Sequence, residues 1–168
     1  MTAQRNFKSQ VRARMQQTGV NYTTARMELL KEYEERQQNA RREAYQEHQT
    51  IVSRFFKDGA MTVMPSKRRT RAHILLYLVN YFQAGRTYTE QEVNYILHEL
   101  WPDFAYLRRE LVDYGYLERN TRAEYWLTSF SPERWGTVLH DEAPAWEFYW
   151  LPEYLNGQEK QVDFFDTI

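Results

Sequence analysis

Residues 86–127 contain two capped helices followed by a hairpin, and this stretch constrains the fold more than any other part of the chain. In the sequence TEQE, Thr89 supplies an N-cap hydroxyl and Glu92 stands three residues later, which is the spacing of a capping box at a helix start. Apolar residues then recur at helical spacing, namely Val93, Ile96, Leu97 and Leu100. Pro102 ends this first helix.

A second helix is expected from Asp103, which offers a new N-cap, to Tyr114. Its apolar stripe consists of Phe104, Leu107, Leu111 and Tyr114. Gly115 follows at the position where a left-handed C-cap favours glycine. The run YLERNTRAEYWL then has two β-prone segments around the polar tip at residues 120–122, which predicts a hairpin. Helix, corner, helix and hairpin together predict an α+β, mainly helical fold centred on a winged helix-turn-helix domain.

The motifs of this stretch also carry a family resemblance. YTEQEVNYIL and DFAYLRRELVDYGYLER, with the closing YW, resemble a bacterial domain of unknown function that is often appended to transcription regulators of the mercury-resistance and arsenic-repressor types. The resemblance runs from about Val52 to Leu127. It implies a winged-helix-like fold and a transcriptional setting, and it implies no catalytic residue and no cofactor.

The sequence predicts three parts: a long N-terminal helical extension at residues 1–51, the winged-helix domain at 52–130, and an aromatic, acidic C-terminal segment at 131–168. The extension divides at Thr18-Gly19-Val20-Asn21 into two helices, because Gly and Asn can end one helix and cap the next. The second helix is expected to be long, since residues 22–56 contain no proline and no glycine.

Two further segments complete the prediction. Residues 61–64 form a short apolar run that is expected to be a strand pairing beside the hairpin, as the first strand of a winged helix does. Residues 131–168 hold eight acids against Arg134 and Lys160, together with several tryptophans and tyrosines. Pro144 and Pro152 argue against one long helix there. We expect this segment to pack on its own domain or on a second subunit.

The two halves of the chain have opposite charges. Residues 1–72 hold fifteen Lys and Arg against seven Asp and Glu, whereas residues 73–168 hold seven against sixteen. The first 27 residues contain five cations and no acid. Such asymmetry is typical of a segment that faces nucleic acid or another polyanion, and a solvated basic arm has the same composition.

The helix at residues 103–114 is the expected DNA reader. With its apolar stripe turned inward, Arg109 faces outward, flanked by Ala105 and Tyr106. Tyr106 and Arg108 are further expected DNA contacts on this helix. Glu110 and Asp113 repel phosphate and favour a protein contact instead.

Cations elsewhere in the domain are expected to contact phosphates. Four of them stand at the start of the preceding helix, where the helix dipole disfavours positive charge, and two stand in the hairpin. They are Lys67, Arg68, Arg69, Arg71, Arg119 and Arg122. A basic loop that serves solubility is the alternative for the first four.

The N-terminal extension loosely resembles a second helix-turn-helix. The polar start of its second helix and the flanking cations are the residue types that contact phosphates and base edges. These residues are Arg12, Arg14, Tyr22, Thr23, Thr24 and Arg26. Any helical hairpin with a glycine turn gives a similar pattern.

These features favour a cytoplasmic, homodimeric transcription regulator that binds double-stranded DNA, since palindromic sites match two-fold proteins. A protein-interaction or effector-sensing winged helix is the alternative, and RNA or ribosome binding is a third hypothesis. The four histidines are scattered and the sequence holds no cysteine, HExxH motif, glycine-rich phosphate loop or nucleophile elbow. We therefore expect no enzyme activity, cofactor or metal. The sequence shows no signal-peptide pattern and no apolar run of membrane-spanning length.

Overall fold

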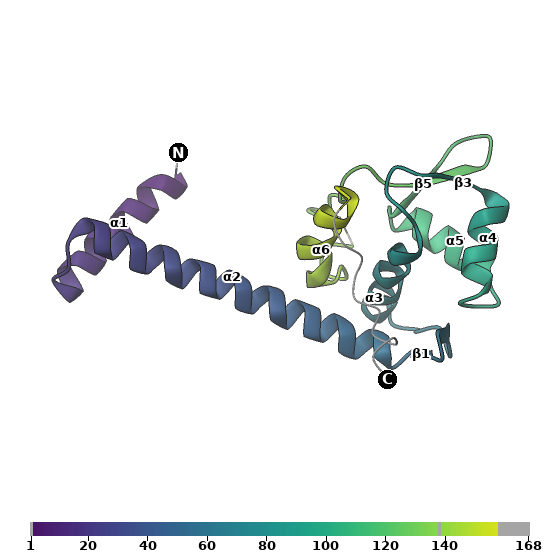
Figure 1. Ribbon diagram of the computed structural model, residues 1–168, viewed down its shortest axis with the longest axis horizontal. Coiled ribbons are helices and arrows are strands. Elements are labelled where there is room, and N and C mark those ends of the chain that lie inside the picture. Colours follow the sequence, from purple (N-terminus) through teal and green to yellow (C-terminus); the bar gives the residue numbers. More distant parts are fainter. Residues whose placement is uncertain (1, 138, 158–168) are drawn as a thin grey trace. The chain divides into compact units, whose positions relative to one another are not determined.

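A computed structural model describes residues 2–137 and 139–157, and it has an α+β fold that is mainly helical. The chain forms two compact units, Met1–Glu43 and Ala44–Ile168 (Figure 1).

The first unit is a helical hairpin. It contains α1 (Thr2–Thr18) and the beginning of α2 (Tyr22–Ser53), whose residues 44–53 belong to the second unit. The predicted turn is confirmed: Gly19 has a φ of 73°, and the Asn21 side chain accepts a hydrogen bond of 2.9 Å from the backbone N–H of Thr24. Arg14 on α1 links the two helices, because its guanidinium donates two hydrogen bonds, of 2.8 and 2.9 Å, to the carboxylate of Glu32 on α2.

The second unit combines helices with two small antiparallel sheets. Its elements after α2 are β1 (Phe56–Lys57), β2 (Ala60–Met61), α3 (Arg68–Leu78), the 3-10 helix η1 (Val79–Tyr81), β3 (Thr87–Thr89), α4 (Glu90–His98), α5 (Phe104–Asp113), β4 (Leu117–Arg119), β5 (Glu124–Leu127) and α6 (Ala145–Leu155). The three-stranded sheet has the order β3-β5-β4, and Figure 1 shows it beside α4 and α5.

The strand beside the hairpin differs from the predicted one. Residues 61–64 were expected to pair there, but Met61 belongs to β2, which pairs with β1 through a tight turn. The strand that pairs with β5 is β3, in which Tyr88 faces Tyr125. Tyr88 is buried between two exposed threonines, so the sheet gains an apolar contact there, whereas residues 62 and 63 are exposed.

The predicted helix caps are confirmed. Thr89 and Glu92 form a capping box, in which the backbone N–H of Glu92 donates to the Thr89 hydroxyl at 3.2 Å and the backbone N–H of Thr89 donates to the Glu92 carboxylate at 2.8 Å. Asp103 caps α5 by accepting from the backbone N–H of Tyr106 at 3.1 Å. Gly115 has a φ of 80°, and an added Cβ would stand 3.3 Å from Pro132 Cγ. Glycine therefore satisfies both a left-handed backbone and a close approach at that point.

The core of the second unit is built around α3. Every residue of α3 from Ala72 to Leu78 is buried. Aromatic rings supply much of the remaining core, and the ring pairs Phe56–Tyr77 and Phe82–Tyr88 meet edge to face. Because this half of α3 is buried on every side, the surrounding elements of the second unit pack against it.

A buried arginine fixes the C-terminal segment onto the second unit. Arg134 donates two hydrogen bonds of 3.0 Å to the Glu147 carboxylate and one of 2.8 Å to the carbonyl of Tyr114. The hydroxyl of Tyr116 also donates to Glu147. The side chains of Arg134 and Glu147 are only 11% and 7% exposed. These contacts join α6 to the chain that leaves α5.

Helix α6 completes this packing. Tyr154 donates a hydrogen bond of 2.5 Å to the carbonyl of Phe82, and the Trp146 ring lies 5.0 Å from the ring of Tyr45. The helix begins after Pro144 and contains Pro152. The described part of the acidic, aromatic segment thus packs on its own unit, which was one of the two expected arrangements. Residues 158–168 lie outside the described residues. None of the described helices is long and apolar enough to cross a membrane.

Removal of one partner from the buried pair should destabilise the protein strongly. Glu147→Gln leaves the Arg134 guanidinium buried without its charge partner, which we expect to cost about 3 kcal/mol of unfolding free energy. The measurement is urea denaturation of the full chain. Glu133→Gln is the matched control because Glu133 is exposed on the same segment. An equal effect of both substitutions would contradict the structural role of the pair.

Two histidines form a second buried polar contact in the core. His48 on α2 and His73 on α3 are fully buried, and their Nδ1 atoms lie 3.0 Å apart. Burial lowers the pKa of His73 to about 4, with a small opposing effect from Glu47 and a reinforcing one from Arg69. The folded protein therefore keeps His73 neutral at a pH where the unfolded chain protonates it.

Stability should fall as the pH drops from about 6.5 to about 4. In this range the unfolded chain binds a proton at residue 73, whereas the folded protein does not. The resulting loss of unfolding free energy reaches on the order of 3 kcal/mol. We expect His73→Gln to flatten this part of a plot of unfolding free energy against pH. His140→Gln is the control, because His140 is exposed. Parallel curves for wild type and His73→Gln would contradict the assignment.

Candidate nucleic-acid interface

Arg109 projects from the outer face of α5. Leu107 and Leu111, two residues away on either side, are fully buried, which turns the residue between them outward. Arg109 is exposed and makes no hydrogen bond or ion pair with any residue that the structure describes. It forms no ion pair with Asp113, which stands one helical turn further on. The guanidinium is therefore available to another molecule.

Arg108 has a different environment from its neighbour. Its guanidinium lies 2.9 Å from Glu90 and donates to the side-chain oxygen of Asn94, and the side chain is only 16% exposed. It also lies 5.8 Å from the centre of the Tyr125 ring. Arg108 thus braces α5 against α4 and the sheet. The structure does not present it on the same surface as Arg109.

Tyr106 and Arg71 engage each other. The Tyr106 hydroxyl accepts a hydrogen bond from Arg71, whose guanidinium also lies 3.6 Å from Glu110. Tyr106 and Glu110 stand one turn apart on α5, so Arg71 on α3 holds both. These two predicted DNA contacts have partners within the protein.

The remaining cations at the start of α3 are partly paired. Arg68 lies 3.7 Å from Glu142, and Arg69 lies 3.2 Å from Glu47. Both side chains are mostly exposed, so these pairs contribute little stability and compete weakly with other ligands. Lys67 is exposed at the N-cap and its side chain forms no cap hydrogen bond. Carboxylates from other segments therefore offset much of the positive charge at this helix start.

The tip of the β4–β5 hairpin presents two cations to solvent. Arg119 and Arg122 are exposed, and neither side chain pairs with a described residue. Asn120 holds the tip in shape by accepting from the backbone N–H groups of Arg122 and Glu124 at 3.0 and 3.1 Å. Ala123 has a φ of 58°, which closes the turn. The hairpin tip therefore has a defined backbone conformation and exposes two guanidinium groups.

The first unit carries the other predicted contacts. All are exposed except Arg14, which is held by Glu32 and lies 3.6 Å from Glu28. The exposed set is Arg12, Tyr22, Thr23, Thr24 and Arg26. Its polar groups stand at the start of α2, where helix amides favour anions.

Several partners of the predicted residues were not identified from sequence. Glu90 and Asn94 hold Arg108, and Glu142 contacts Arg68. None stands near its partner in the chain, so only the packing brings them together. For Arg134 the sequence did contain an indication, because an arginine among acidic and aromatic residues suggests a buried ion pair. Among the described residues, no group of three or more side chains is arranged to hold a metal ion.

The comparisons with known proteins match one part of the chain. Residues 60–127 match a family described as an uncharacterized protein conserved in bacteria (DUF2087). No curated protein and no solved structure matches the chain. The matched range begins at β2 and ends with β5, so it includes α3, α4, α5 and the three-stranded sheet. This part of the protein is thus similar to a conserved bacterial domain of unknown function.

Proposed function

We propose that the protein is a bacterial transcription regulator whose matched domain is a winged helix that binds duplex DNA. The observation that carries this proposal is the element order α3-β3-α4-α5-β4-β5, with sheet order β3-β5-β4 and with unpaired cations on α5 and on the hairpin tip. A helix with an exposed arginine fits the major groove, and a cationic hairpin beside it fits the DNA backbone.

The proposed roles follow from the surroundings of each side chain. Arg109 reads a guanine edge, because it is exposed, unpaired and able to make two parallel hydrogen bonds. Arg119, Arg122 and Lys67 contact phosphates, since they are exposed and have no described partner. Arg108, Tyr106 and Arg71 support α5 from behind. In this proposal they set the position of the reading helix without touching DNA.

The first unit supplies a second set of contacts. Arg12 and Arg26 are exposed cations, and Thr23 and Thr24 offer hydroxyl and amide donors at the start of α2. We propose that this unit adds phosphate contacts. If α5 does not read the DNA bases, this unit is the next candidate for that role. A cytoplasmic location and a homodimer belong to the same proposal.

A protein-binding winged helix is the second candidate function. It is favoured by Asp113, which is exposed on α5 and has no described partner, and by Glu110 on the same helix. Negative charge on that helix repels phosphate. RNA binding has no separate structural support beyond the basic N-terminal half.

The DNA-reading role of Arg109 can be tested by comparing specific with random duplex. Arg109→Ala should weaken binding to the preferred site by about 1 to 3 kcal/mol and change binding to random DNA little. Arg119→Ala should weaken both alike and lower the salt slope by roughly one. Fluorescence anisotropy across a salt series measures these quantities, with a preferred site selected from a random duplex pool.

Lys57→Ala is the control, because Lys57 is an exposed cation in the separate β1–β2 hairpin. It should leave affinity and specificity unchanged. If Arg109→Ala leaves the ratio of specific to random binding as it was, α5 is not the reader and Arg26→Ala is the next variant. If wild type binds no duplex at low salt, the proposed function is wrong.

We expect a homodimer in solution, formed through the first unit. Met27 and Tyr33 on α2 are 64% and 56% exposed, so this unit leaves apolar area without cover. Light scattering should give twice the 20.5 kDa mass of the chain. Met27→Glu should shift the mass toward the monomer, whereas Gln38→Glu, at an exposed polar position of the same helix, should not. A monomer at micromolar concentration would contradict the expectation.

A further inference from the structure

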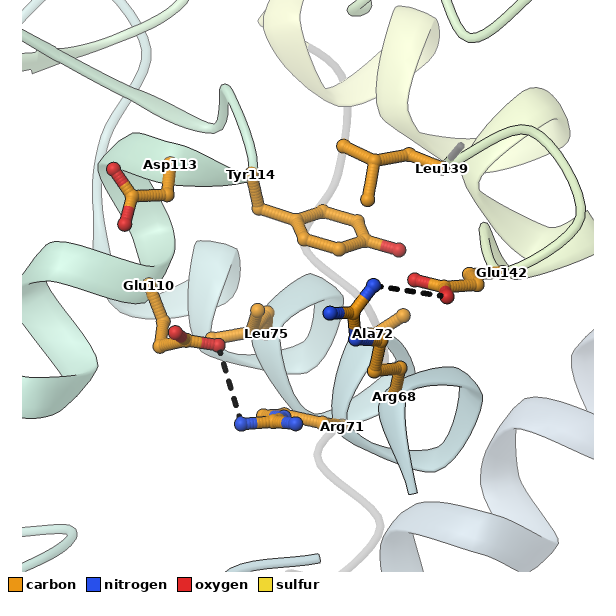
Figure 2. Close-up of a pocket in the computed structure, with 9 residues that line it drawn as sticks. All are labelled: Arg68, Arg71, Ala72, Leu75, Glu110, Asp113, Tyr114, Leu139 and Glu142. Atoms are coloured by element: carbon orange, nitrogen blue, oxygen red, sulfur yellow. Dashed lines mark ion pairs between the residues drawn. The ribbon is translucent and has the colours of Figure 1, made fainter. Parts of the chain in front are cut away.

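The second unit contains a small cavity whose lining does not include Arg109. It has a volume of about 240 Å³ and lies between the start of α3, the end of α5 and residues 139–142 (Figure 2). Ala72, Leu75 and Leu139 give it an apolar lining, and charged groups surround this lining. Drug-sized ligands occupy pockets of roughly 300 Å³ or more, so this cavity suits a smaller molecule.

The charges around the cavity leave a negative excess. The lining includes two guanidinium groups and three carboxylates. Figure 2 shows Arg71 paired with Glu110 and Arg68 paired with Glu142, at 3.6 and 3.7 Å. Asp113 is exposed and has no partner among the described residues. Since each cation already faces a carboxylate, an entering anion would meet competition, whereas an entering cation would meet the unpaired acid.

Two buried polar atoms at the cavity have no hydrogen-bond partner in the described structure. They are the hydroxyl of Tyr114, a residue that is only 8% exposed, and Oε2 of Glu142. Burial, with the nearby carboxylates, raises the pKa of Tyr114 to about 12, so the hydroxyl stays neutral and can accept a hydrogen bond. Unsatisfied buried polar atoms are rare in native proteins. A ligand that donates hydrogen bonds would satisfy both.

We propose that this cavity binds a small organic cation, a primary amine on a short apolar body. Its ammonium donates to Glu142 Oε2 and to the Tyr114 hydroxyl, and Asp113 contributes the remaining negative charge. Its apolar body lies against Ala72, Leu75 and Leu139. The proposal does not depend on DNA binding, because Arg109, the proposed DNA reader, does not line the cavity.

Three probes of similar shape and different charge test which sign of charge the cavity prefers in a ligand. They are 2-phenylethylamine, 2-phenylethanol and phenylacetate, each titrated into the full chain without DNA and followed by NMR and calorimetry. We expect the amine to bind at least about tenfold more tightly than the alcohol, and phenylacetate to bind most weakly. Equal affinities, tighter binding of phenylacetate, or no binding of the amine at millimolar concentration would overturn the proposal.

Variants test the location of the site. Glu142→Gln and Tyr114→Phe should each weaken amine binding, by about tenfold and a few-fold respectively. Arg68→Ala should tighten it a few-fold, because it removes the cation that competes for Glu142. Glu133→Gln on the same segment is the control and should change nothing.

The direction of the Arg68→Ala effect is decisive, since an anion site would lose affinity with the same substitution. Far-ultraviolet circular dichroism and the melting temperature check that each variant is folded. If Glu142→Gln does not fold, Tyr114→Phe and Arg68→Ala still decide the outcome. Amine binding that none of the three variants alters would place the ligand elsewhere and overturn the assignment.

Discussion

The buried pair between Arg134 and Glu147 is the interaction on which the second unit depends. It fixes α6 against the point where the chain leaves α5, because the same guanidinium also binds the carbonyl of Tyr114. Both side chains are largely shielded from water, so removal of either one leaves the other charge without compensation. The C-terminal segment is thereby part of the core, although the family match ends before it begins.

The local features of the fold could be predicted from sequence, because their causes lie within a few residues. Thr89 and Asp103 cap helices through atoms three residues away, and Gly115 satisfies a backbone angle at its own position. The third strand could not be predicted in the same way. Tyr88 belongs to a strand only because Tyr125 stands opposite, and no neighbouring residue contains that information.

The candidate interface shows the same limit. Helical geometry was sufficient to turn Arg109 outward, since the burial of Leu107 and Leu111 settles its direction. The contacts of Arg108 depend on how α4 crosses α5, and those of Arg71 depend on how α3 approaches α5. Adjacent arginines in the sequence LRREL therefore have opposite environments. A pattern of charge identified the residues, and only tertiary packing separated those with partners from those without.

The position of Arg71 has a consequence for regulation. One guanidinium contacts both Tyr106 and Glu110 on α5, and it also lines the cavity behind that helix. A cavity ligand and an α5 ligand that each favour a different arrangement of Arg71 would be thermodynamically coupled. By reciprocity, each would then change the affinity of the other by one common factor, whichever of the two binds first.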